Sequence, residues 1–365
     1  MIYVYVFLAS IFFAYFADHS KDKAVIVMFS LISILIPAIF GGLRHYTIGI
    51  DSSGYGISIS RAAMGYSSFL DFLPRSSVEP GCALLFYYGV KMWGDYTGAF
   101  FLFQLITMTC IYIGAYKHRK LTPPPITLLV FFLMFYNRMF NEIRQGIAAS
   151  IIFMGLDTLE NKQYSKFIIY IAAATLFHYS AAANIPLFLG MLILTTSETY
   201  LKNGSSRFII ILSTIAFMMF ARPAMSLVVN NIPFLAKYNF YIIDSRNDGA
   251  TPMVIYYLGE LLMFMFYGRH AKHIFRGMHG EDNASFYFFG TIFCMAFNLG
   301  VQFFQRLLFY WDFAHVLILA ALPSFVKEKN LRVMVFIVTL VVVFSLWWRC
   351  FIFRGYFWTY PFKFA

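Results

Sequence analysis

The feature that most constrains this chain is a series of apolar runs, each about 13 to 20 residues long, that recur along the whole sequence. Runs such as residues 333 to 348 are apolar on every side, so they lack the two-residue alternation of barrel strands. In lipid, only helices and closed barrels satisfy the hydrogen bonds of the backbone. We therefore predict an all-α fold, a polytopic transmembrane helical bundle of about 12 to 13 membrane segments that include short or re-entrant helices.

The composition excludes the usual water-soluble classes of protein. Apolar residues make up 60% of the chain and charged residues 12%, whereas about a quarter of the residues are charged in an ordinary soluble domain. A net charge of +11 could indicate nucleic-acid binding in a soluble protein, but here the basic residues lie in short loops between apolar runs. We attribute the charge to the positive-inside bias and to anionic lipid headgroups, and expect the lipid bilayer and no nucleic acid as a partner.

The apolar runs succeed one another without a linker, so we expect residues 1–365 to form a single integral membrane domain. The longest polar gaps, near 44–79 and 222–251, fall on the face opposite the lysine-rich loops, which we place in the cytoplasm. The run at 80–93 is too short for a straight crossing, which needs about 20 residues, and we predict a re-entrant half-helix that starts against protein. The expected spans are 2–17, 24–43, 80–93, 97–116, 123–137, 142–156, 167–177, 179–195, 208–221, 252–267, 285–303, 307–325 and 331–348.

Arginine is distributed differently from lysine. On this topology ten of the 13 lysines are cytoplasmic, but ten of the 15 arginines lie on the opposite face. This enrichment opposes the positive-inside bias. Because guanidinium binds phosphate or carboxylate with a planar fork, the pattern predicts an anionic ligand at the far face.

Two polar stretches flank the first long gap. GGLRHYTIGIDSSGYG places Arg44, Asp51 and Tyr55 just outside a span, where the alternative to a functional role is a solvated loop whose arginine anchors the helix end. Glu79 directly precedes Pro80 at the start of the predicted half-helix. Its carboxylate is either a cap and dipole partner for that helix or a buried acid or base.

NRMFNEIRQGIAA opens another short span with polar residues. Polar side chains recur every fourth residue on one stripe that cannot face lipid, at Asn137, Asn141 and Gln145. Arg138 and Glu142 are also four apart and can form an ion pair. Arg144 then has no obvious local partner, and an arginine of that kind in a membrane segment is a candidate functional residue.

Two further stretches carry candidates on the far face. His178 in LFHYSAAANIP lies at a predicted hairpin tip, where it is either a hydrogen-bonded structural residue or a base kept neutral because burial lowers the pKa of histidine. In QRLLFYWDFAH, Arg306 and Tyr310 are one helical turn apart, while Asp312 and His315 are close enough to pair with each other.

The remaining sequence patterns indicate no metal site and no disulfide, and they include aromatic residues with a structural role. No HxxxH, HExxH or DxD spacing supports a metal-dependent site. The four cysteines show no CxxC pairing and indicate neither a metal site nor a disulfide. Aromatic residues near span ends suit membrane headgroup belts, among them Trp347, Trp348, Trp358 and Tyr360.

Taken in order, these pieces resemble the EpsG-like family of Wzy-type polysaccharide polymerases. The matching pieces cover roughly residues 40 to 310 and are Arg44 with Gly49 and Asp51, Glu79 to Gly81, Asn141 to Ala148, Phe177 to Ala181, and Arg306 with Tyr310. Ile50 stands where the family often has a small hydroxyl residue, which leaves the charged positions intact.

The resemblance implies a bacterial inner-membrane enzyme for O-antigen, capsule or exopolysaccharide assembly. Such enzymes work at the periplasmic face and transfer a growing glycan from undecaprenyl diphosphate to the non-reducing end of a lipid-linked repeat unit. The expected partners are this undecaprenyl-diphosphate-linked oligosaccharide and the chain-length regulator and flippase proteins of the same pathway. No cofactor is implied.

The chemistry assigns roles to the matched residues. A metal-free site must stabilise a departing diphosphate with guanidinium groups, and we expect Arg44, Arg144 and Arg306 to surround it. Hydrogen-bonding substrate contacts are expected from Gln145, Tyr310 and Asn141. Glu79, His178 and Asp51 are the candidate bases for the acceptor hydroxyl, with Asp51 third.

Two other classes fit part of the pattern. A flippase or transporter of lipid-linked oligosaccharide would use similar basic side chains, but it should show paired halves with broken helices, which the sequence does not reveal. A membrane O-acyltransferase that uses His178 is the third class.

Overall fold

The computed structural model describes residues 2–185, 226–227, 230–231, 250–279, 287–288, 290–292, 294–295 and 302–365. The chain divides into two compact units, Met1–Ala182 with Met334–Ala365, and Ala183–Val333. Within the described residues the protein is helical and forms no named strand. Among the described residues, five helices are long and apolar enough to cross a membrane, and shorter apolar helices accompany them. The predicted all-helical membrane fold is thus confirmed, whereas the count of 12 to 13 segments stays a prediction.

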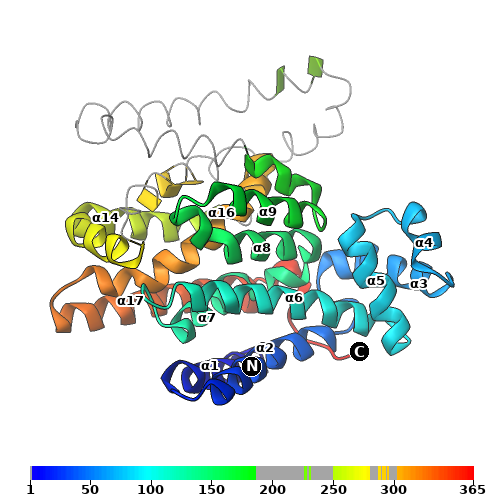
Figure 1. Ribbon diagram of the computed structural model, residues 1–365, viewed down its shortest axis with the longest axis horizontal. Helices are drawn as coiled ribbons and strands as arrows, with labels where there is room; N and C mark the ends of the chain where they lie inside the picture. The colour runs from blue at the N-terminus through cyan, green and yellow to red at the C-terminus, as the bar shows by residue number, and fades with distance from the viewer. Residues whose placement is uncertain are drawn as a thin grey trace. The chain divides into compact units, whose positions relative to one another are not determined.

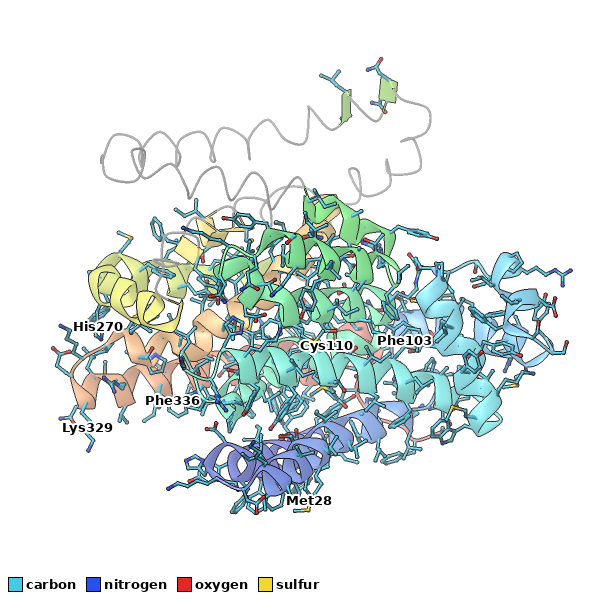
Figure 2. The ribbon with its side chains drawn as sticks, in the orientation of Figure 1. Met28, Phe103, Cys110, His270, Lys329 and Phe336 are labelled. Carbon is cyan, nitrogen blue, oxygen red and sulfur yellow. The ribbon has the colours of Figure 1, made fainter. Side chains whose placement is uncertain are left out.

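The first unit is built around a row of helices that each pack on the next (Figure 1). In order of packing, the row is α1 (Ile2–His19), α2 (Lys23–Gly42), α6 (Tyr96–Lys117), α8 (Ile143–Glu160) and α9 (Tyr164–Thr175). Figure 2 shows Met28 on the outer side of α2, whereas Phe103 and Cys110 of α6 lie inside the bundle, where they are almost fully buried. The outward side chains of α2 are apolar because that face meets lipid in a membrane.

Hydrogen bonds from small and polar side chains join the first two helices to their neighbours. Asp22 caps α2 by accepting from the backbone N–H of Ala24 at 2.7 Å. Ser10 of α1 donates to the carbonyl oxygen of Ser33 of α2 at 2.7 Å. Proline at position 37 interrupts the hydrogen bonds of α2, and its own carbonyl oxygen accepts from the Tyr136 hydroxyl at 2.6 Å.

The polar stretch 44–79, expected as a loop, is largely made of short helices. They are a π-helical turn η1 (Ser52–Gly56), α3 (Ile57–Met64), α4 (Phe69–Phe72) and η2 (Leu73–Arg75). α5 (Pro80–Trp93) follows, with proline at its first position and Gly94 ending it at φ 80°, a conformation that glycine adopts without strain. Asp95 then caps α6 through the N–H of Thr97 at 2.8 Å. This corner joins α5 and α6 into a tightly packed pair.

The segment before α8 and the end of the chain complete the first unit. α7 (Pro124–Phe131) continues into the π-helix η3 (Phe132–Tyr136) and the 3-10 turn η4 (Arg138–Phe140). α17 (Lys329–Trp347) is followed by η8 (Trp348–Phe353), η9 (Tyr356–Trp358) and an extended tail. Trp347, expected in a headgroup belt, is instead 1% exposed, and its indole Nε1 donates to the side chain of Asn137 at 2.9 Å. Trp348, Trp358 and Tyr360 are exposed.

In the second unit, α14 (Ala250–His279) and α16 (Gln302–Ala321) pack on each other and on the 3-10 turn η7 (Leu322–Phe325). Buried polar residues join the two helices. His315 contacts Glu260 at 2.6 Å, and the Tyr257 hydroxyl donates to Asp312. The alternative in which Asp312 and His315 pair with each other is therefore wrong, because both side chains bond across to α14. The predicted span 208–221 and parts of 179–195 and 285–303 lie outside the described residues.

Candidate active site

Three stretches that are far apart in the sequence meet around Arg144 in the first unit. Arg144 Nη1 lies 2.7 Å from Glu79 Oε2, and Arg144 Nε donates to the Tyr55 hydroxyl at 3.1 Å. That hydroxyl donates in turn to Asp51 Oδ2 at 3.0 Å. The guanidinium carbon is also 4.7 Å from the centre of the Tyr55 ring, within cation–π range. Glu79, Arg144, Tyr55 and Asp51 thus form one continuous polar chain.

The local backbone explains how these side chains reach one another. Arg144 is in the first turn of α8, so its side chain leaves the helix end instead of the middle of the bundle. Asp51 and Tyr55 are four residues apart on a helical turn, which places them side by side. Glu79 precedes α5 in an extended conformation, and its side chain makes no cap hydrogen bond. The cap interpretation of Glu79 is therefore wrong, because its carboxylate turns to Arg144 and its Oε1 accepts from the N–H of Tyr179 at 3.3 Å.

The start of α5 is packed on the end of α9, whereas the prediction that α5 is a re-entrant half-helix stays a prediction. The Gly81 N–H donates to the carbonyl oxygen of Leu176 at 2.8 Å, and the Cys82 thiol donates to that of Phe177 at 3.1 Å. A Cβ at Gly81 would lie 2.8 Å from the same Leu176 oxygen and 3.0 Å from the Phe177 ring. Glycine at position 81 therefore permits the close approach that brings Glu79 beside Tyr179.

His178 lies between α9 and the 3-10 turn η5 (Tyr179–Ala183), next to the Glu79 contact. Its Nδ1 accepts from the Ser180 N–H at 3.2 Å and is 2.8 Å from the Ser180 hydroxyl. A ring nitrogen that accepts from a backbone N–H cannot itself carry a proton, so the neutral ring holds its proton on Nε2. In this tautomer Nε2 is a hydrogen-bond donor, which disfavours His178 as the base.

Arg44 is fully buried behind the same chain of residues. Its Nη2 donates to Ser52 Oγ at 3.2 Å and its Nη1 donates to the carbonyl oxygen of Gly41. The guanidinium lies 4.2 Å from the centre of the Phe100 ring and 4.8 Å from that of Phe140. Burial lowers the pKa of Arg44 to about 9, which keeps the group protonated at neutral pH. No carboxylate pairs with it among the described residues, and its Nε has no hydrogen-bond partner there.

Arg144 is the accessible arginine of the pair. Its side chain is 26% exposed, whereas Arg44 has no exposed surface. The Arg144 side chain is therefore partly accessible, whereas Arg44 is a buried positive charge that donates to Ser52. Burying a charge without a counter-ion is costly, so Arg44 makes this part of the protein electropositive at an energetic cost.

Of the other polar residues between positions 137 and 145, some lie at the site and some lie in the core. The Asp51 N–H donates to Asn141 Oδ1 at 3.4 Å, so Asn141 belongs to the site, and Gln145 is buried one residue beyond Arg144. Arg138 and Glu142 form the ion pair predicted from their spacing, at 2.8 Å. Asn137 is fully buried and binds away from the site.

Arg306 and Tyr310 belong to the second unit, in α16. The side chain of Arg306 is exposed, and that of Tyr310 is 1% exposed. Their gathering with Arg44 and Arg144 around one ligand stays a prediction.

Two members of the site, Tyr55 and Ser52, have no role that was predicted from the sequence. Tyr55 was noted beside Asp51, but its hydroxyl also bridges to Arg144. The four-residue spacing could have predicted the first contact, whereas no local signal indicates the second. Ser52 connects Arg44 to the carbonyl oxygen of Phe140 through hydrogen bonds of 3.2 and 3.1 Å.

Within the described residues, no three histidine, cysteine, aspartate or glutamate side chains are gathered as metal ligands would be.

One family model covers nearly the whole chain. The family model described as the EpsG family matches residues 27–364. The chain belongs to the EpsG family. EpsG proteins are Wzy-like polymerases, and with several helices capable of crossing a membrane, this EpsG-family chain is a multi-pass membrane protein. Family membership indicates a membrane polysaccharide polymerase. No curated protein and no solved structure matches the chain.

Proposed function

We propose that this protein is a glycosyltransferase that polymerises lipid-linked oligosaccharide repeat units at the periplasmic face of the bacterial inner membrane. The growing glycan leaves its undecaprenyl diphosphate carrier and is joined to the non-reducing end of a second lipid-linked unit. The proposal rests on Arg144, whose guanidinium is held by Glu79 and Tyr55 and whose side chain remains about a quarter exposed. Such a group recognises a diphosphate with a planar fork.

The reaction exchanges one bond to the anomeric carbon for another. The bond between this carbon and the diphosphate oxygen breaks, and its electron pair leaves with the diphosphate. An acceptor hydroxyl oxygen forms the new bond, and its proton passes to a base. Arg144 stabilises the negative charge that develops on the departing oxygen, which is the step where a fixed, partly desolvated donor contributes most.

We propose Asp51 as the base ahead of Glu79 and His178, because Glu79 is paired with Arg144 and the neutral His178 ring presents a donor. Both oxygens of Glu79 are engaged, one by the Arg144 guanidinium and the other by the Tyr179 N–H. The neutral His178 ring carries its proton on Nε2, because its Nδ1 accepts from the Ser180 N–H. It is therefore better suited to donate a hydrogen bond to a phosphate or sugar oxygen than to accept a proton. Asp51 is half-buried and accepts from a neutral hydroxyl, that of Tyr55.

The other members of the site have supporting roles. Arg44 raises the positive potential behind Arg144, and its position depends on Ser52. Asn141 fixes the backbone of Asp51. Gln145, Arg306 and Tyr310 are proposed substrate contacts, and the chain-length regulator and flippase proteins of the pathway are proposed partners. The full count of 12 to 13 membrane segments, in a single membrane domain, belongs to this proposal as well.

Incubation of the detergent-purified protein with undecaprenyl-diphosphate-linked repeat units tests the function directly. A polymerase converts them to a ladder of lipid-linked glycans, visible by gel electrophoresis and mass spectrometry, and releases undecaprenyl diphosphate. Unchanged substrate in this assay, with transfer of the same lipid across a vesicle membrane, would instead identify a flippase. Acyl groups added to the sugar from an acyl donor would identify an acyltransferase.

A further inference from the structure

The last residues of the described chain lie against the loop that leads into the candidate site. Residues 363 to 365 pair with residues 43 to 45 through an isolated antiparallel bridge between Arg44 and Phe364. The His45 N–H donates to the carbonyl oxygen of Lys363 at 2.8 Å, and the Ala365 N–H donates to that of Leu43 at 2.9 Å. Residues 355–365, called the tail below, therefore supply hydrogen bonds that the loop cannot make within itself.

A second part of the tail is anchored in the core. Thr359 is fully buried, and its hydroxyl oxygen accepts from the side-chain amide of Asn137 at 3.1 Å. Its carbonyl oxygen accepts from the hydroxyl of Tyr3. The ring of Phe362 stacks on Phe40 with the ring centres 4.0 Å apart, and the Tyr3 ring meets it edge-on at 5.6 Å. These contacts attach the tail to α1, α2 and the segment just before α8.

The loop is held from both sides at Gly49. The Gly49 N–H donates to the carbonyl oxygen of Trp358 in the tail at 3.4 Å. On the other side, a Cβ at Gly49 would lie only 2.1 Å from the carbonyl oxygen of Phe140, and φ at this position is +90°. Glycine is required there by both criteria. Phe140 ends the 3-10 turn η4, and the helix that carries Arg144 begins three residues later.

The loop therefore lies between the tail and the turn that precedes α8. Asp51 follows Gly49 by two residues, and its N–H donates to Asn141 in the same region. A shift of this loop would move Asp51 and Tyr55 relative to Arg144. It would lengthen the 3.1 Å hydrogen bond that Arg144 donates to the Tyr55 hydroxyl. Misplacing a reacting group by about 1 Å can lower a rate by about 100-fold.

We propose that the tail is a positioning element of the active site, with Phe362 as the side chain that fixes it. It holds the 43–49 loop against the η4 turn so that Asp51 and Tyr55 stay aligned with Arg144. This inference rests on the proposed polymerase function. The tail touches no substrate and acts on the site through the 43–49 loop.

Phe362→Ala in the full-length protein tests the inference, with Lys363→Ala as the matched control. The Lys363 side chain is exposed, and this residue contacts the loop through its backbone carbonyl, which the control retains. We expect Phe362→Ala to lower kcat about tenfold per folded protein, with a smaller change in KM, and Phe362→Tyr to restore it. Lys363→Ala should stay within about twofold of the wild type.

Hydrogen–deuterium exchange gives a readout that does not depend on activity. Phe362→Ala should speed exchange at the His45 and Gly49 amides, because both amides donate to the tail. Unchanged exchange at these amides, or a wild-type kcat at equal folded protein, would overturn the inference. If Phe362→Ala yields no folded protein, Phe362→Leu is measured in the same way. Failure of the wild type to polymerise would reject the proposed function, while the exchange result would still decide whether the tail holds the loop.

Discussion

The proposed site depends on one small group, the hydroxyl of Tyr55. Tyr55→Phe removes it while leaving the ring in place, including its 4.7 Å cation–π contact with Arg144. The hydroxyl accepts from the Arg144 guanidinium at 3.1 Å and donates to the Asp51 carboxylate at 3.0 Å. A hydrogen bond to a charged group contributes about 1.5–3 kcal/mol. If one such bond is lost in the transition state, kcat falls roughly 10- to 100-fold.

The assay is polymer formation from lipid-linked repeat units, followed as initial rate against substrate concentration. Tyr112→Phe is the matched control, because the Tyr112 hydroxyl bonds to Ser30 Oγ at 2.7 Å between α6 and α2, in another part of the first unit. Both variants should unfold within a few degrees of the wild type, since each loses one hydroxyl and no packing volume. A Tyr55→Phe enzyme with the kcat of Tyr112→Phe would refute the argument that this hydroxyl aligns the site.

Two further predictions concern packing and pH. Gly81→Ala places a methyl group 2.8 Å from the carbonyl oxygen of Leu176, so it should destabilise the protein by about 1–3 kcal/mol. Gly54→Ala, which meets no atom within 4 Å, should not, and equal melting temperatures for the two variants would contradict the packing argument. Burial opposes the charge of His118, but the carboxylate of Glu160 at 3.1 Å outweighs it and raises the pKa of His118. The pair therefore stabilises fully below the ordinary pKa of histidine, about 6.5, and loses this contribution as pH rises through the raised pKa. The melting temperature should fall over that range, and a wild-type profile that matches Glu160→Gln would contradict the assignment.

The sequence predicted features that depend on local spacing and apolar length. The start of α5 follows from Pro80, and the Arg138–Glu142 pair follows from a separation of one helical turn. The contact between Asp51 and Tyr55 was not predicted, although it has the same local origin. Such features are readable because a helix fixes which residues are neighbours.

Contacts set by the tertiary fold were not readable in this way. Arg144 finds its carboxylate in Glu79, 65 residues away, because the start of α5 packs on the end of α9. Trp347 was assigned to a headgroup belt because its amphipathic ring suits that environment, but its indole N–H is equally satisfied by a buried amide. The polar stretch between α2 and α5 was read as a loop, although it forms short helices whose apolar sides pack on α5.

In the proposed reaction, the planar fork of Arg144, held by Glu79 and Tyr55, binds and stabilises the departing diphosphate. Arg144→Lys keeps the charge but cannot bond to Glu79, Tyr55 and a phosphate in one plane. Arg138→Lys is the matched control, because Arg138 pairs with Glu142 in the adjacent turn. The most direct measurement is the kcat/KM of the two purified variants for undecaprenyl-diphosphate-linked repeat units. We predict a loss of about 100-fold or more for Arg144→Lys at unchanged melting temperature, with nearly normal polymer from Arg138→Lys. A full-length glycan ladder made by Arg144→Lys at the wild-type rate would contradict the claim.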